Sequence, residues 1–239
     1  MIRRATLLAG ALAALGACQQ GDATSDRPES AQAFPQPDRP VSELGANEFS
    51  TETARDSRGE AETVMDLAEI EPGMTVADIG AGEGYYTVRL AERVGARGRV
   101  LAQDIDDAAL ERLGNRVERE QFRNVSIKHG AADDPRLPEN SFDRVFMVHM
   151  YHEVGEPYAF LWRLWPALAE GGQVIVVDVD RPTDRHGIAP MLLACEFEAA
   201  GYRLVAFKDA PELAGYYAQF ERADARPEPG AIAPCTAGA

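Results

Sequence analysis

The sequence has little positive charge for its length. Lysine and arginine number 24 against 39 acidic residues, which gives a formal net charge of -15. A nucleic-acid-binding protein needs a clustered basic face for the phosphates, and the sequence shows none, so we expect no nucleic-acid partner. The excess of acid suits either a cationic ligand or a surface whose charge keeps the protein soluble.

The sequence also lacks an apolar run long enough to cross a bilayer. The apolar stretch from Ala5 to Ala17 is too short, follows two arginines and ends in small residues, which is typical of an export signal. Leu15-Gly16-Ala17-Cys18 resembles the lipidation signal of bacterial lipoproteins. By that resemblance residues 1–17 are a signal peptide, and a lipid on Cys18 anchors the chain to the membrane of the cell envelope, facing the periplasm. The alternatives are a weakly hydrophobic start that stays attached, or a start codon placed too early.

Cysteine is scarce, with three in the chain. Cys195 falls in a predicted helix, and Cys235 falls in a tail rich in proline, alanine and glycine. A disulfide between them is possible outside the cytoplasm, but nothing in the spacing supports it. We expect Cys195 to be a buried small residue instead.

An apolar content of 45% in 239 residues suits one domain with extensions. Residues 18–47 are polar and proline-rich and show no apolar periodicity, which predicts a disordered tether. Residues 224–239 have the same character and predict a disordered tail. The folded domain is therefore expected at residues 48–223.

Inside this domain, helical and strand patterns alternate. Helices are predicted at residues 60–70, 85–94, 107–121, 158–169 and 191–200, the fourth of them interrupted by Pro166. Strands are predicted at residues 75–79, 99–105, 125–129, 144–150, 173–178, 203–208 and 216–221. Apolar strands separated by helices predict an α/β fold with a doubly wound, mostly parallel seven-stranded sheet. The last two strands have no helix between them and predict a C-terminal antiparallel hairpin.

The first predicted strand runs into a glycine-rich turn, DIGAGEG, at residues 78–84. Open parallel sheets bind ligands beyond the carboxyl ends of their strands. A dinucleotide loop, GxGxxG, would need a glycine where Tyr85 stands, whereas the third glycine is Gly84. This spacing disfavours a nicotinamide-dependent oxidoreductase and suits a nucleoside without a pyrophosphate. Asp104, at the end of the second strand, can accept hydrogen bonds from both ribose hydroxyls.

Three further segments continue the pattern: GAADD at residues 130–134, FDRVFMVHMYHEV at 142–154 and LWRLWPALAEGGQVIVVDVD at 161–180. In order and spacing, these segments and the glycine turn resemble the class I S-adenosylmethionine-dependent methyltransferases, over about residues 60–221. The resemblance implies a Rossmann-like methyltransferase fold and S-adenosyl-L-methionine as cofactor. It implies that the cofactor is bound by Asp78, Gly80, Gly82, Gly84, Asp104, Ile105, Ala132 and Asp133.

Within that set the resemblance also implies separate roles. The three glycines line the methionine and ribose end, and Asp78 organises the loop. Asp104 holds the ribose and Ile105 packs on the adenine, while Ala132 and Asp133 meet the adenine edge. Ala131 departs from the family pattern, because related sequences often carry an aspartate at this position, and this weakens the adenine assignment.

His149, His152 and Glu153 lie at and just after the end of the fourth predicted strand, where the family places the methyl-acceptor pocket. We predict these three residues as the catalytic candidates. His152 could be a general base oriented by Glu153 or another carboxylate, or both could be loop residues that stabilise the fold. For His149 a structural role is favoured. The histidine pair matches neither HExxH nor HxxEH, so we predict no metal site.

Two neighbouring features have either a functional role or a purely structural one. Trp162 and Trp165 could stack on an acceptor, but the leucines beside them favour a place in the core. The loop at residues 180–190, which includes His186, is either part of the acceptor wall or a solvated connector.

The sequence thus favours a methyltransferase that acts on a small-molecule acceptor. The alternative is a non-catalytic envelope lipoprotein that uses the fold for ligand binding or scaffolding. S-adenosylmethionine is made in the cytoplasm, so an enzyme in the periplasm would lack an obvious supply, and this favours the alternative.

Overall fold

The computed structural model describes residues 27–43, 51–213 and 215–236. The predicted signal peptide and the predicted lipidation site at Cys18 lie outside these residues. In the described ranges, no helix combines the length and the apolar character needed to span a membrane.

The described residues contain a sheet, α-helices and short 3-10 helices. The strands are β1 (Thr75–Ile79), β2 (Arg99–Asp104), β3 (Val125–His129), β4 (Phe142–Val148), β5 (Leu168–Asp178), β6 (Tyr202–Ala210) and β7 (Gly215–Arg222). The α-helices are α1 (Glu52–Ser57), α2 (Glu60–Leu67), α3 (Tyr85–Val94), α4 (Asp107–Arg119), α5 (Pro157–Leu164) and α6 (Pro190–Ala199). The 3-10 helices are η1 (Glu29–Ala31), η2 (Tyr151–Glu153), η3 (Trp165–Ala167), η4 (Thr183–Arg185), η5 (Pro211–Leu213) and η6 (Pro229–Ala231).

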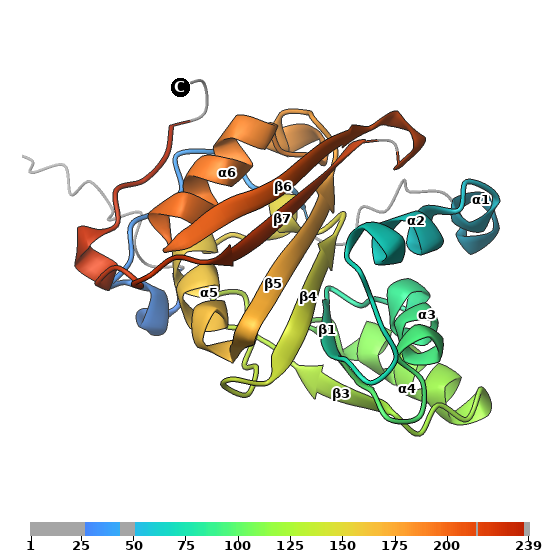
Figure 1. Cartoon of the computed structure of the whole chain (residues 1–239). Helices are drawn as coiled ribbons and strands as arrows, with labels where there is room; N and C mark the ends of the chain where they lie inside the picture. Colours follow the sequence, from blue (N-terminus) through green and yellow to red (C-terminus); the bar gives the residue numbers. More distant parts are fainter. Residues whose placement is uncertain (1–26, 44–50, 214, 237–239) are drawn as a thin grey trace, which may run out of the picture.

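The strands form one sheet in the order β3-β2-β1-β4-β5-β7-β6 (Figure 1). Pairing is parallel from β3 through β5, and β7 runs antiparallel to both β5 and β6. The predicted doubly wound sheet with an antiparallel C-terminal hairpin is therefore confirmed. The strand order reverses between β1 and β4, which is the point where open α/β sheets bind ligands.

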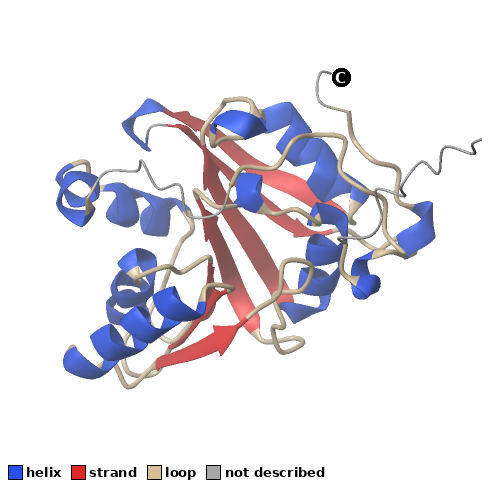
Figure 2. Ribbon diagram, turned by 180° about the vertical axis from the view of Figure 1, so that it is seen from behind, coloured by secondary structure: helices blue, strands red, loops and turns tan. Residues whose placement is uncertain are grey.

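Helices cover both faces of the sheet, as Figure 2 shows from behind. Successive side chains of a strand point to opposite faces, and β5 illustrates the result. Val174 and Val176 belong to a hydrophobic cluster with residues of α5 and α6. Ile175 and Val177 belong to another cluster, with residues of α2 and α3. Burial on both faces explains why β5 reads as an unbroken apolar run.

The predicted and observed element boundaries differ most around Pro166. The sequence predicts a helix over residues 158–169 that is interrupted by Pro166, and in the structure α5 ends at Leu164 and a 3-10 turn follows through Ala167. Proline has no N–H to donate and its ring clashes within a helix, so the α-helix stops before it. The following strand begins at Leu168, five residues before the predicted start.

The structure differs from the expected tether in residues 27–43. Arg39 forms an ion pair with Glu196 of α6 at 2.8 Å, and both side chains are fully buried. Phe34 and Ala31 are buried in a cluster with Tyr158 and Ala159 of α5. The apolar anchors are few and irregularly spaced, so the segment has no periodicity although it packs on the domain.

The predicted tail also packs on the domain over residues 224–236. Arg226 lies over the ring of Trp162, 3.4 Å from its centroid, and the indole N–H of Trp162 donates to the carbonyl of Pro227 at 2.8 Å. Ile232 is buried in the cluster that holds Phe34. Trp162 therefore packs between the domain and both terminal segments.

Cys235 forms a disulfide with Cys195 of α6, 40 residues earlier in the sequence. The expectation that Cys195 is an unbonded buried residue is therefore wrong. Spacing gave no signal for the bond, because the fold brings the tail back across α5 and α6. The backbone N–H of Cys235 also donates to the hydroxyl of Tyr158 at 2.7 Å.

Candidate functional site

A cavity of about 970 Å³ opens at the carboxyl ends of β1, β2 and β4, where the strand order reverses. The glycine turn, the end of β2 and the segment after β4 form much of its wall. Its lining includes Val41, Ser42, Glu52, Arg55, Gly80, Ala81, Gly82, Tyr85, Gln103, Asp104, Ile105, Ala131, Ala132, His149, Met150, Glu153, Val154, Gly155 and Phe160. The cavity is large enough for a cofactor and a small molecule together.

The glycines of the turn have different roles. Gly80 and Gly82 line the cavity with positive φ values of 68° and 54°. A Cβ on Gly80 would lie 2.9 Å from the side chain of Met150, whereas a Cβ on Gly82 would meet no atom within 4 Å. Gly84, predicted to line the cofactor site, instead lies against α4, where a Cβ would be 2.4 Å from Leu113. Gly84 therefore serves the packing of the turn and does not line the cavity.

Asp104 organises the glycine turn. Its carboxylate accepts hydrogen bonds from the backbone N–H groups of Gly82 at 2.8 Å, Ile105 at 2.7 Å and Asp106 at 3.0 Å. These bonds use both oxygens but leave lone pairs, because a carboxylate offers about four acceptor sites. The carboxylate thus holds the backbone in place and can still accept from a diol in the cavity.

The structure places Asp78 behind the turn and not in the cavity wall. Its side chain is buried and accepts a hydrogen bond from the hydroxyl of Thr87 at 2.6 Å. Burial raises the pKa of Asp78 to about 7, and the nearby Asp104 carboxylate acts in the same direction. Asp78 therefore joins β1 to α3, while the loop-organising role predicted for it falls to Asp104.

The predicted adenine residues separate in the structure. Ile105 and Ala132 line the cavity, together with Ala131. Asp133 is buried away from it and forms an ion pair with Arg163 of α5 at 2.7 Å. Asp133 also accepts a hydrogen bond from Ser30 at 2.5 Å, so it ties the N-terminal segment to α5.

The residues at this end of the cavity fit an adenosine group. Asp104 offers an ionisable acceptor beside a glycine that leaves open space, and Ile105 with Ala132 provides apolar surface for a base. S-adenosylmethionine, implied by the sequence resemblance, carries such a group.

Of the three catalytic candidates, His149 and Glu153 line the cavity. His149 has a positive φ of 54°, and its Nε2 lies 3.6 Å from the carboxylate of Glu60 in α2. Burial opposes the ionisation of Glu60, but hydrogen bonds from His149 and Arg55 outweigh it and lower the pKa of Glu60 to about 2. Glu60 thus fixes the ring of His149 at the cavity wall.

His152 lies behind the cavity wall. It is 1% exposed, and its Nδ1 lies 2.9 Å and 3.0 Å from the two carboxylate oxygens of Asp178, at the end of β5. The carboxylate that orients His152 is therefore Asp178, which the sequence analysis did not single out. Trp162, Trp165 and the loop at residues 180–190 do not line the cavity, although one ligand atom of His186 in that loop lies within 4.8 Å of one from Glu153.

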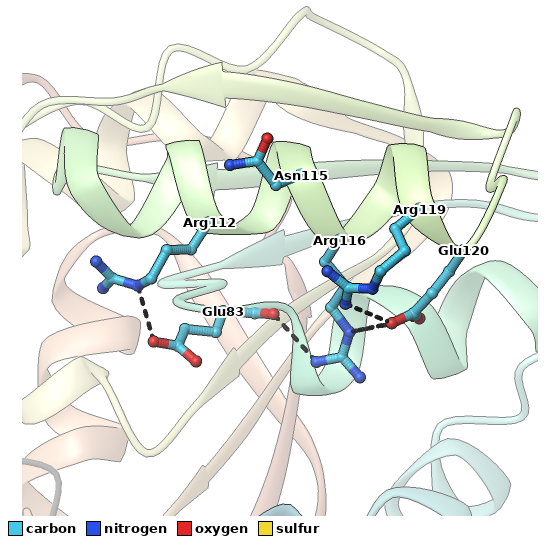
Figure 3. A pocket seen from close by; sticks show the side chains of 6 residues that line it. All are labelled: Glu83, Arg112, Asn115, Arg116, Arg119 and Glu120. Atoms are coloured by element: carbon cyan, nitrogen blue, oxygen red, sulfur yellow. Dashed lines mark hydrogen bonds and ion pairs between the residues drawn. The ribbon is translucent and has the colours of Figure 1, made fainter.

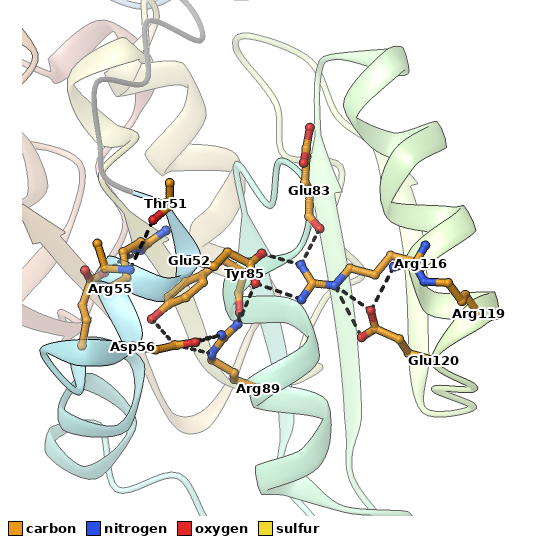
Figure 4. Close-up of polar contacts among 12 residues, drawn as sticks. Thr51, Glu52, Arg55, Asp56, Glu83, Tyr85, Arg89, Arg116, Arg119 and Glu120 are labelled. Atoms are coloured by element: carbon orange, nitrogen blue, oxygen red, sulfur yellow. Dashed lines mark hydrogen bonds and ion pairs between the residues drawn. The ribbon is translucent and has the colours of Figure 1, made fainter.

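Helix α1 covers the cofactor end through a network of charged residues that the sequence analysis missed. Glu52 forms an ion pair with Arg116 of α4 at 2.5 Å, and Asp56 forms one with Arg89 of α3 at 2.6 Å (Figure 4). The guanidinium of Arg55 lies over the ring of Tyr85, 3.7 Å from its centroid. Nothing local in the sequence marks these residues, because each partner comes from another helix.

The same network reaches the glycine turn from α4. Arg112 and Glu83 lie side by side with an ion pair of 2.8 Å, and Arg116 donates to the carbonyl of Glu83 at 3.1 Å (Figure 3). Exposed pairs of this kind stabilise by less than about 1 kcal/mol each, so they shape the rim more than they hold the fold.

Comparisons with known proteins agree with this geometry. Residues 76–172 match a family model described as a methyltransferase domain. A solved S-adenosylmethionine-dependent methyltransferase from Aquifex aeolicus superposes with a TM-score of 0.61 at 22% identity, over 72% of this chain and 97% of that one. The chain has the Rossmann-like methyltransferase fold. The [4+2]-cyclase SpnF superposes with a TM-score of 0.62 at 16% identity, over 81% of this chain and 91% of that one.

Curated relatives match part of the chain. A demethylmenaquinone methyltransferase from Listeria welshimeri is 28% identical over 118 residues, which are 49% of this chain and 50% of the relative. One from Bacillus cereus is 29% identical over 119 residues, 50% of each chain. The chain thus spans about half the length of the curated relatives it matches.

Proposed function

We propose that the chain is an S-adenosylmethionine-dependent methyltransferase with a small-molecule acceptor. The observation that carries the proposal is the Asp104 carboxylate at the wall of a cavity beside the open glycine turn. The position of the cavity at the reversal of strand order and the family match over residues 76–172 support it.

The cofactor supplies a methyl group on a positively charged sulfur. The residues of this chain need to bind it, orient the acceptor and keep water out. Asp104 would hold the ribose hydroxyls, and Gly82 would leave room for the cofactor beside the backbone. Met150 and Phe160 give the cavity an apolar wall on the acceptor side.

The acceptor end favours a molecule with an apolar body. Val41, Met150, Val154 and Phe160 provide apolar surface there, and Ser42, His149 and Glu153 provide the polar groups. The names of the curated relatives point to quinone-type acceptors, whose reduced hydroquinone form combines an apolar body with a nucleophilic position. If the acceptor must lose a proton, His149 and Glu153 are the candidates that line the wall, and His152 is placed too deep for direct contact.

Methyl transfer to a panel of phenols, hydroquinones and amines, with labelled S-adenosylmethionine, tests the proposal. The expected result is label in at least one ring-bearing acceptor, together with the demethylated cofactor. Binding of the cofactor without product from any acceptor would favour a scaffolding role. Absence of cofactor binding would overturn the proposal.

We further propose that residues 1–17 are removed on export and that Cys18 carries a lipid anchor in the cell envelope. The disulfide between Cys195 and Cys235 supports this, because such bonds persist mainly in oxidising compartments. Mass spectrometry of the mature N-terminus tests it. We expect an acylated Cys18, and a chain that still begins at Met1 would contradict the proposal.

A further inference from the structure

Two histidines and a glutamate converge beside the acceptor end of the cavity. His152 and Glu153 come from η2, and His186 follows η4 in the loop after β5. One ligand atom from each of the three side chains lies within 4.8 Å of the other two. Sequence motifs gave no sign of this group, because His186 is more than thirty residues from the other two.

The hydrogen bond to Asp178 determines which nitrogen of His152 faces the cluster. An ionised carboxylate only accepts hydrogen bonds, so Nδ1 of His152 must carry the proton toward Asp178. In the neutral ring, Nε2 then presents a lone pair, and it lies 4.0 Å from the carboxylate of Glu153. That lone pair is the part of a neutral imidazole that binds a metal ion.

The loop holds His186 in place at the third corner. Its ring meets that of His152 edge to face, with centroids 5.7 Å apart. Its Nδ1 is buried and forms no hydrogen bond within the described part of the chain. His186 has a positive φ of 54°. Two residues later, the backbone N–H of Ile188 donates to the carbonyl of Val179 at 2.9 Å, and this hydrogen bond anchors the loop to the end of β5. A strained conformation that the surroundings hold in place is common where a side chain has a function.

We propose that His152, Glu153 and His186 bind a divalent transition-metal ion, with zinc the preferred one. Two imidazoles and one carboxylate form a ligand set found in zinc sites that keep a position open for another ligand. Zinc–ligand distances of about 2.0–2.2 Å require ligand atoms about 3.4 Å apart, so the side chains need to close by up to about 1.4 Å.

Asp178 completes the arrangement as a positioning residue. Histidine ligands of metals usually donate their other ring N–H to a carboxylate, which fixes the tautomer and makes the ring a better ligand. Asp178 is fully buried and also accepts from the backbone N–H of Val179 at 2.8 Å, so its orientation is fixed. Since Glu153 lines the cavity, the metal would lie at the edge of the acceptor end.

Zinc titration of the full chain, stripped with a chelator and monitored by competition with a chromophoric chelator, tests the site. We expect one equivalent to bind, with His152→Ala or His186→Ala weakening the affinity at least 100-fold. Asp178→Asn should weaken it 10- to 100-fold, as removal of a partner behind a metal ligand does. His129→Ala is the matched control, because His129 is exposed and lies on β3, and it should bind zinc as the parent chain does.

Cobalt substitution adds a readout that a folding defect does not imitate. A cobalt-loaded chain should show the visible absorption of a low-coordinate site, and His186→Gln should abolish the band while circular dichroism stays unchanged. Absence of stoichiometric zinc binding, or binding that His186→Ala leaves intact, would overturn the proposal. The titration needs neither cofactor nor acceptor, so its outcome is independent of the proposed methyl transfer.

Discussion

The two ends of the cavity are built in different ways. Most of the cofactor end comes from the turns that follow β1, β2 and β3, which are consecutive strands, and α1 covers it. The acceptor end combines the segment after β4 with Val41 and Ser42 from the N-terminal segment. The N-terminal segment is held there by Arg39 and Glu196, which are 157 positions apart. Turns at the ends of consecutive strands form most of the cofactor end, whereas contacts between residues far apart in the sequence form the acceptor end.

This difference decides what the sequence could predict. The glycine turn and Asp104 are visible because a sharp turn and a diol acceptor require particular residues at fixed spacing. The bounds predicted for β1, α3 and β3 match the structure to the residue. Asp78, Gly84 and Asp133 were assigned to the cofactor by resemblance, but they support the wall from behind.

The acceptor end was largely beyond such prediction. Arg39, Phe34 and Cys235 lie in polar or proline-rich stretches with no periodicity, and their partners are on α5 and α6. Asp178 and His186 could have been suspected, because each lies at or after the end of a strand at the ligand edge. Their contact with His152 follows only from the packing of η2 against the loop after β5.

The largest effect is expected from removing the buried Arg39, which holds the N-terminal segment on the domain. Arg39→Met should lower the free energy of unfolding by about 3–5 kcal/mol, because it leaves the Glu196 carboxylate buried without its cation. Urea denaturation followed by circular dichroism measures this. Replacing both residues with methionine should recover most of the loss. A single variant as stable as the parent would show that residues 27–43 are not packed on the domain.

Removing the disulfide tests how much the packing of the C-terminal segment, residues 224–236, stabilises the domain. The double variant Cys195→Ser, Cys235→Ser should lose about 2–4 kcal/mol of stability, as expected for a bond that closes a loop of about 40 residues. Thermal unfolding with and without reductant measures the change, and the variant should not respond to reductant. Equal stability of the oxidised parent and the variant would rule out a stabilising bond.

Asp104→Ala tests the cofactor end. The affinity for S-adenosylmethionine should fall about 30- to 100-fold, or about 2–3 kcal/mol, because the ribose loses a charged acceptor and the turn loses three backbone bonds. Calorimetric titration measures it. Asp107→Ala is the matched control, since its carboxylate is 92% exposed, and it should bind normally. An Asp104→Ala affinity within twofold of the parent would remove Asp104 from the site.

Glu60→Gln tests the charge of Glu60 through the pH dependence of the free energy of unfolding. The folded-state pKa of Glu60, about 2, lies below its ordinary value of 4.5, so its contribution to stability is fully present above pH 4.5 and is lost as the pH falls toward 2. The variant should therefore be less stable by about 1–2 kcal/mol above pH 5, and the difference should shrink on acidification. Denaturation curves at several pH values follow it. A difference that is constant with pH would contradict an ionised, hydrogen-bonded Glu60.

The central claim is that the cavity beside Asp104 binds the adenosine group of the cofactor. A crystal structure of the chain with the demethylated product, S-adenosylhomocysteine, tests it most directly. The account predicts both ribose hydroxyls on the Asp104 carboxylate and the adenine between Ile105 and Ala132. Ligand density elsewhere, or a ribose that does not contact Asp104, would contradict it.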